Sequence, residues 1–75
     1  MTRREQGKMV GDTYLTEREC EALTLLAQGK QNSEISKEMG NSENSVGSLI
    51  KIIYRKIDVR NRASAGVAAA KAGLV

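Results

Sequence analysis

Apolar residues recur at the spacing of an α-helix in four segments of the chain. In the clearest segment, 43–57, an apolar residue returns every third or fourth position: Val46, Ile50, Ile53 and Ile57. Segments 17–28 and 32–39 carry shorter stripes: Leu23, Leu26 and Ala27 in the first, Ile35 and Met39 in the second. The last segment, 62–72, is rich in alanine. The pattern predicts an all-α fold of four helices.

Polar residues and glycines at the segment boundaries predict where each helix begins and ends. Thr16 and Glu19 have the spacing of a capping box, and Gly29 is expected to end the first helix. The other expected caps directly precede their helices: Asn32 or Ser33, Ser42 and Asn61. Residues 1–13 are polar and contain two glycines, so we expect a flexible arm there and the folded domain in residues 14–75.

Composition excludes several classes of protein. The chain has 75 residues, which is enough for one domain. It has no His and a single Cys, which leaves little material for a zinc site, a catalytic Cys/His or Ser/His pair, or an internal disulfide. No apolar run approaches the roughly 18 residues of a membrane span. We therefore expect no enzyme activity, no cofactor, no metal and no membrane association.

Charge is distributed unevenly along the chain. The net charge is +3, but residues 1–43 carry −2 and residues 44–75 carry +5. A basic second half has two interpretations: it faces a polyanionic partner, or it is a solvated Lys/Arg surface. The charge alone favours neither.

A short helix, a tight turn near Gly40 and Asn41, and a longer amphipathic helix make up the pattern of a helix-turn-helix motif. In such motifs the second helix enters the major groove of DNA. Four residues of segment 43–57 cluster opposite its apolar face, and we call them the polar stripe: Asn44, Ser48, Lys51 and Arg55. Gly47 and Ile52 flank this stripe.

Six segments, in order, resemble LuxR/GerE-type DNA-binding domains: LTERE (15–19), LTLLAQG (23–29), NSEIS (32–36), SENSV (42–46), IYRKIDVRNRA (53–63) and AGLV (72–75). The resemblance implies a bacterial transcription regulator in the cytoplasm, associated with the nucleoid. It also implies a homodimer formed through the fourth helix and bound to a roughly palindromic site. RNA polymerase or another LuxR-type regulator is a further implied partner. Most members carry an N-terminal sensor domain, and a few are stand-alone domains of about this length.

Two sets of site residues follow from the helix-turn-helix pattern and the resemblance. The DNA-binding candidates are Asn32, Asn44, Ser45, Gly47, Ser48, Lys51, Arg55 and Lys56. The dimerisation candidates are Ala65, Val67, Ala68, Ala69 and Ala72. For Arg55, Lys56 and Arg60 two roles are open, phosphate contacts or internal salt bridges, and we favour a pair between Arg60 and Glu19. Arg62 is expected to be a surface charge.

The chain departs from the family pattern in the predicted DNA-facing region. Gly47 and Ser33 stand where a Lys is common, Leu49 where a His is common, and Ile52 where an Asn is common. An exposed Ile52 either contacts a thymine methyl group or is a sticky surface residue. These departures motivate an alternative function, a protein-interaction module that heterodimerises with a LuxR-type regulator. A fragment of a sigma factor is a third possibility, which the link at residues 59–62 and the fourth helix disfavour.

Overall fold

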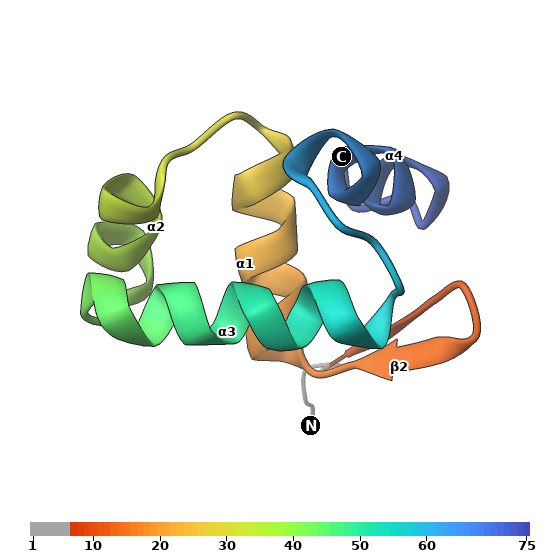
Figure 1. Cartoon of the computed structure of the whole chain (residues 1–75), viewed down its shortest axis with the longest axis horizontal. Helices are drawn as coiled ribbons and strands as arrows, with labels where there is room; N and C mark the ends of the chain where they lie inside the picture. The colour runs from red at the N-terminus through yellow and green to blue at the C-terminus, as the bar shows by residue number, and fades with distance from the viewer. Residues whose placement is uncertain (1–6) are drawn as a thin grey trace, which may run out of the picture.

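The computed structural model describes residues 7–75, in which a β-hairpin precedes four helices (Figure 1). The elements are β1 Lys8–Val10, β2 Thr13–Leu15, α1 Glu17–Ala27, α2 Asn32–Met39, α3 Glu43–Lys56 and α4 Arg62–Lys71. The predicted helical fold is confirmed, and each helix ends within about one residue of its predicted bounds. The small two-stranded sheet is an addition to that prediction.

The hairpin shows that the predicted flexible arm is wrong for residues 8–13. β1 and β2 pair antiparallel, with Lys8 opposite Leu15 and Val10 opposite Thr13. Val10 and Leu15 lie on the inner face of the hairpin and belong to the buried core. Gly11 takes a positive φ of 64°, which the tight turn between the strands requires. The rest of the predicted arm, residues 1–6, lies outside the described residues.

Side-chain caps define the starts of the helices. The capping box of α1 is present, because Thr16 N donates to Glu19 Oε1 at 2.8 Å and Glu19 N donates to Thr16 Oγ1 at 3.2 Å. Ser42 and Asn61 cap α3 and α4 as predicted. The predicted cap of α2 is wrong: Gln31 holds that position, and its backbone N–H donates to Glu34 Oε1 at 2.8 Å.

The core lies around α1, which runs across the middle of the molecule with α3 packed over it (Figure 1). Val46, Ile50 and Ile53 of α3 are buried, which confirms the predicted apolar face of that helix. α2 packs on α3, and α4 packs mainly on α1. Among the described helices, none combines the length and the apolar character that crossing a bilayer requires.

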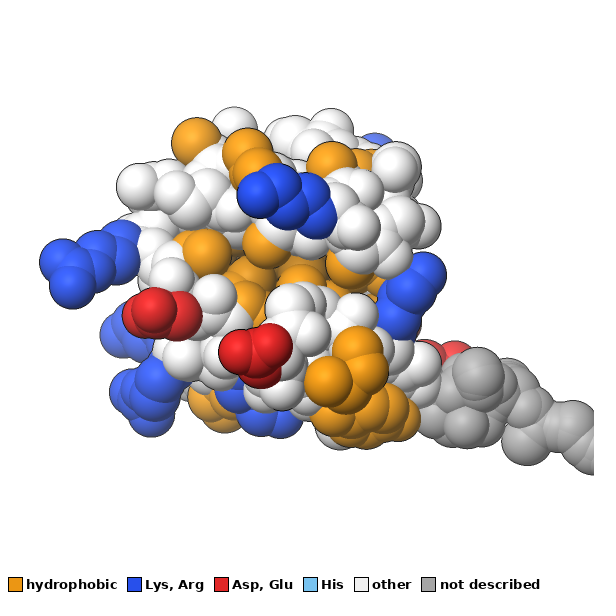
Figure 2. Space-filling view, turned by 90° about the vertical axis from the view of Figure 1, so that its right-hand side faces the viewer, with side chains coloured by type: hydrophobic (Ala, Val, Ile, Leu, Met, Phe, Trp, Pro, Cys, Tyr) orange, Lys and Arg blue, Asp and Glu red, His pale blue; other side chains and the backbone are white. Residues whose placement is uncertain are grey.

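One end of the molecule carries the hairpin and α4 (Figure 2). Hydrophobic side chains appear there over α4 at the top and near the hairpin at the bottom, between polar and charged groups. On the outer face of the hairpin, Met9 and Tyr14 are directly opposite one another and are both more than half exposed. This end is distinct from the surface of α3 that carries the polar stripe.

Candidate nucleic-acid interface

The helix-turn-helix is formed by α2, a turn at Gly40 and Asn41, and α3. Gly40 has a left-handed φ of 72°, and Asn41 N donates to Ser36 O at 2.9 Å, so the chain leaves α2 sharply. Ser42 then accepts a hydrogen bond from Ser45 N at 3.1 Å and begins α3. The turn therefore holds α2 and α3 at a fixed angle to one another.

All four residues of the polar stripe are exposed on α3: Asn44, Ser48, Lys51 and Arg55. The buried residues Val46, Ile50 and Ile53 hold the opposite side of the helix in the core. The polar stripe therefore projects from a helix whose orientation about its own axis is set by the packing of its buried side. Such a surface combines rigidity with short polar and long basic groups, as DNA-reading helices require.

A shallow hollow borders the stripe on the side of α2. Its lining comes from both helices of the motif: Asn32, Glu43, Asn44, Gly47, Ser48 and Lys51. A Cβ added at Gly47 would lie 4.0 Å from Asn32 Nδ2, so the first residue of α2 stands next to this glycine. The structure therefore brings five of the eight DNA-binding candidates to one site. The lack of a side chain at Gly47 keeps the hollow open.

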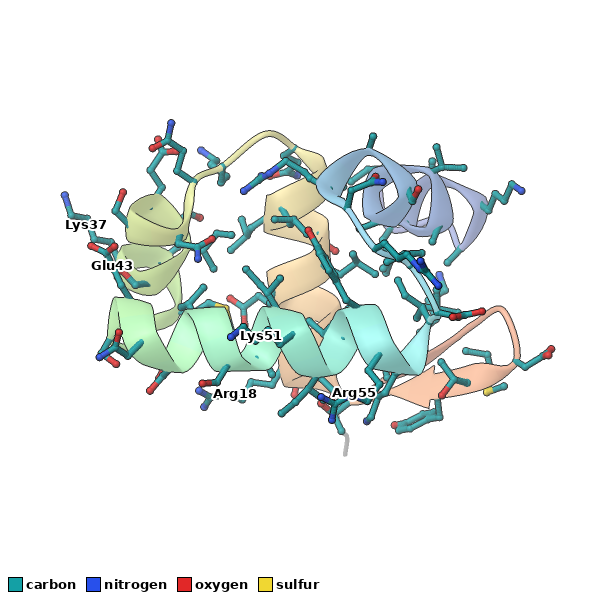
Figure 3. All side chains as sticks on the ribbon, viewed as in Figure 1. Arg18, Lys37, Glu43, Lys51 and Arg55 are labelled. Atoms are coloured by element: carbon teal, nitrogen blue, oxygen red, sulfur yellow. The ribbon has the colours of Figure 1, made fainter. Side chains whose placement is uncertain are left out.

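A second hollow borders the stripe on the side of α1. It is lined by Arg18, Asn44, Ser45, Ser48, Leu49 and Ile52. Figure 3 shows Arg18 projecting from α1 beside α3, on the same edge as Arg55. Sequence reasoning missed Arg18, because its place beside α3 depends on how α1 crosses that helix. Its position within the resembling LTERE segment was the only available signal.

Lys56 forms an ion pair with Glu19, although its side chain stays 37% exposed. Its Nζ lies 2.9 Å from Glu19 Oε1, and the Glu19 residue is only 6% exposed. The predicted pair between Arg60 and Glu19 is therefore wrong, because Lys56 at the end of α3 occupies that place. The ion pair gives Lys56 a structural role, and Arg55 is the neighbouring exposed cation in this turn.

The Glu19 carboxyl is stabilised in its charged form. Burial by itself raises the pKa of this group, but the hydrogen bonds from the Thr16 backbone and from Lys56, together with the Lys56 charge, outweigh burial. The net result is a pKa below the ordinary glutamate value. This ion pair joins the start of α1 to the end of α3 and so helps to set the crossing of the two helices.

Arg62 is exposed, as predicted for a surface charge, but it also has a structural role. Its Nη1 donates to Lys30 O at 2.8 Å and to Leu26 O at 3.3 Å. These carbonyls lie in the last turn of α1 and just after it, where helix carbonyls lack partners within the helix. Arg62 therefore ties the start of α4 to the end of α1.

The predicted dimer face needs a correction. Ala65 and Ala69 are 0% exposed and lie in the core, so neither can contact a second subunit through its side chain. Alanine-rich spacing could not distinguish the buried side of α4 from the exposed one. Val67 is 55% exposed, and Ala68 and Ala72 are partly buried. Two small residues share the outward side of α4 with Val67: Ala63 and Ala70.

Cys20 is half-buried beside the capping box. Burial is the main cause that raises the pKa of its thiol, and the Glu19 charge adds to it. Its Sγ donates to Leu15 O at 3.7 Å. A thiol in this setting carries little thiolate and packs as a small apolar group.

Several known regulators are similar to this chain. It is 43% identical over 61 residues to the transcriptional regulatory protein LiaR of Bacillus subtilis (strain 168), an overlap of 81% of this chain and 29% of LiaR. It is 39% identical over 62 residues to the transcriptional activator protein AnoR of Acinetobacter nosocomialis, an overlap of 83% of this chain and 26% of AnoR. With the transcriptional regulatory protein DesR of Bacillus subtilis it shares 41% identity over 51 residues, 68% of this chain and 26% of DesR.

The chain spans about a quarter to a third of the length of these relatives. Residues 13–69, which include α1, α2, α3 and most of α4, match the family model described as bacterial regulatory proteins, luxR family. The resemblance to this family is thereby confirmed, and five of the six segments lie inside the matched region. Because the matched region exceeds half of the chain, this protein belongs to the luxR family of bacterial regulatory proteins.

Proposed function

We propose that this chain is the DNA-binding domain of a bacterial transcription regulator and that it reads duplex DNA with α3 in the major groove. One observation carries the proposal: all four residues of the polar stripe are exposed on a helix whose other side is buried in the core. A major groove about 12 Å wide admits one such helix. Family membership supports the same function.

The residues of the interface have different expected roles. Asn44 and Ser45 lie in the first turn of α3, where the positive end of the helix dipole favours a phosphate group. Ser48 is short and lets the helix approach the base edges. Lys51 is long enough to reach a guanine edge or a phosphate. Two further cations at the rim are assigned to phosphate oxygens: Arg18 and Arg55.

A homodimer completes the proposal. Two copies of α3 presented by a two-fold axis would read a roughly palindromic site with half-sites about one helical turn apart. The exposed apolar part of α4, with Val67 at its centre, supports this helix as the contact between subunits. RNA polymerase and other LuxR-type regulators remain further candidate partners.

Replacement of Lys51 tests the proposed role of α3. We expect Lys51→Ala to weaken binding to a duplex selected from random DNA by about tenfold and to relax preference at one base pair, because a good base contact contributes about 1–3 kcal/mol. The measurement is a mobility-shift titration. Lys30→Ala removes the same charge from the link between α1 and α2, where Lys30 pairs with Glu38, and should change affinity much less.

The alternative function, heterodimerisation with a LuxR-type regulator without DNA binding, makes a different prediction in the same titration. A chain that acts only through protein contacts would leave every duplex unshifted at low salt, where phosphate contacts are strongest. Equal loss of binding in Lys51→Ala and Lys30→Ala would show general electrostatic attraction and would contradict the role of α3.

A further inference from the structure

Ile52 is an exposed β-branched residue in the middle of the proposed DNA-binding surface. It is 43% exposed, although the other three isoleucines of α3 and its C-cap are buried or half-buried. At 100° per residue, its side chain leaves α3 roughly 40° from Ser48 and 60° from Arg55. It therefore shares the outward face of the helix with the polar stripe, on the side of the hollow that Arg18 lines.

The chemistry of this side chain limits what it can recognise. Isoleucine has no hydrogen-bond donor or acceptor, so it gains nothing from a phosphate oxygen or from a polar base edge. Of the groups that the four base pairs present in the major groove, the C5-methyl of thymine is the apolar one. An isoleucine presented to the groove is therefore complementary to thymine.

We propose that Ile52 is a specificity-determining residue that contacts the C5-methyl group of a thymine in the binding site. This inference rests on the proposed function, because it requires α3 to lie in the major groove. Ser48, one turn before Ile52, is short and leaves room for a base edge to approach. Leu49, half-buried in the same hollow, extends the apolar surface under Ile52.

The charges around Ile52 favour DNA over an apolar protein partner. Arg18 lines the same hollow, and Arg55 is three residues further along the same face. A protein interface of useful size buries about 800 Å² on each partner around an apolar centre. Ile52 and the half-buried Leu49 form an apolar surface that is too small for such an interface. Its size matches a single thymine methyl group, and Arg18 and Arg55 beside it suit the phosphates that border the groove.

The expected effect is that of burying one methyl group. Burial of a single methyl or methylene group corresponds to about a fourfold change in affinity. We therefore expect that replacing the contacted thymine by uracil, which removes the C5-methyl and retains every hydrogen-bonding group, lowers the affinity of the unmodified protein about fourfold at one position of each half-site.

A double-mutant cycle between protein and DNA tests this. A duplex is first selected from random DNA, and versions are then made with uracil at each thymine in turn. Binding of the unmodified protein and of Ile52→Ala is measured by fluorescence anisotropy. The inference predicts that Ile52→Ala binds the thymine duplex several-fold more weakly and no longer distinguishes thymine from uracil at the contacted position. Met9→Ala, which truncates an exposed apolar side chain of the hairpin, should keep the full preference.

The outcomes distinguish failure of the Ile52 inference from failure of the proposed DNA-binding function. If the unmodified protein binds DNA but tolerates uracil at every position within measurement error, Ile52 does not read a methyl group and only this inference fails. The same holds if Ile52→Ala keeps the thymine preference. The proposed function fails as well if the unmodified protein binds no duplex at low salt and Ile52→Ala, with an unchanged circular dichroism spectrum, also binds none.

Discussion

Glu19 is a charged residue at the edge of an apolar core, and two groups compensate the burial of its carboxylate. The Thr16 backbone N–H and Lys56 Nζ both donate to its Oε1, at 2.8 Å and 2.9 Å. Its own backbone N–H is satisfied by Thr16 Oγ1. A buried carboxylate without such partners would be strongly destabilising. Glu19 thus completes the capping box of α1 and also holds α3, the helix of the proposed interface.

Stability should fall in acid because of Glu19. Its pKa in the folded protein is lowered, so the unfolded chain binds a proton more readily. The stabilisation is therefore complete above the ordinary glutamate pKa and is lost as the pH falls through the lower folded value. We expect Glu19→Gln to cost about 1–2 kcal/mol of unfolding free energy at pH 7. Urea unfolding at pH 7 and below pH 4 measures this cost, which should shrink in acid.

The matched control for this prediction is Glu21→Gln on the same helix. Glu21 is exposed, and its replacement should change stability by no more than about 0.5 kcal/mol. A penalty for Glu19→Gln that stays the same at both pH values would show that shape, and not charge, makes this residue important.

Gly47 weakens α3 at the point where that helix meets α2. A glycine inside a helix costs about 1 kcal/mol relative to alanine. A Cβ would lie 4.0 Å from Asn32 Nδ2, an ordinary van der Waals distance, so an alanine fits at this position. Gly47 therefore lowers the stability of α3 relative to an alanine at the same position.

Two substitutions at Gly47 separate helix stability from charge. Gly47→Ala should raise the unfolding free energy by about 1 kcal/mol and change DNA affinity little. Gly47→Lys should add a phosphate contact next to Lys51, raise DNA affinity, and steepen the dependence of log affinity on log salt by about 1 per subunit. Anisotropy titrations at several salt concentrations measure this slope. An unchanged slope for Gly47→Lys would place position 47 away from the phosphates.

Sequence reasoning predicted the helices well because their signals are local. Apolar spacing and caps such as Thr16 and Asn61 depend on residues a few positions apart, and the structure confirms them. The hairpin was missed because each strand has three residues and buries only one of them, Val10 in β1 and Leu15 in β2. Such strands are too short for an alternating pattern to emerge.

The proposed interface was predictable only in part, because some of its residues come from a helix distant in sequence. The polar stripe follows from periodicity within α3, whereas Arg18 joins it from another helix. Lys56, the partner of Glu19, lies 37 residues further along the chain, and several other Lys and Arg residues of the second half were possible partners from the sequence. In α4, small residues on every side hide which side is buried, so Ala65 and Ala69 were misassigned.

At the scale of the molecule, the interface and the exposed side of α4 are separate surfaces. α3 presents the polar stripe, while Val67 lies on α4, which packs on the other helix of the core, α1 (Figures 1 and 3). This separation is compatible with the proposal that one chain binds DNA and a second subunit at once. The proposed dimer can therefore be weakened without altering α3.

Val67→Glu should dissociate the dimer. A carboxylate in a small apolar contact is left without a partner, and we expect the dimer dissociation constant to rise at least about tenfold. Sedimentation equilibrium measures this constant. Met9→Glu places the same charge on the exposed face of the hairpin and should leave it unchanged. If Val67→Glu and the unmodified chain have the same dissociation constant, α4 is not the contact.

An NMR titration of the isotope-labelled chain with a selected duplex tests whether α3 faces DNA. If α3 lies in the major groove, the largest amide shift changes occur in residues 43–55, with further changes at Arg18 and Asn32. Met9 and Tyr14 of the hairpin should change little. Shift changes concentrated on the hairpin while α3 is unaffected, or no changes at low salt with any duplex, would show that α3 does not bind DNA.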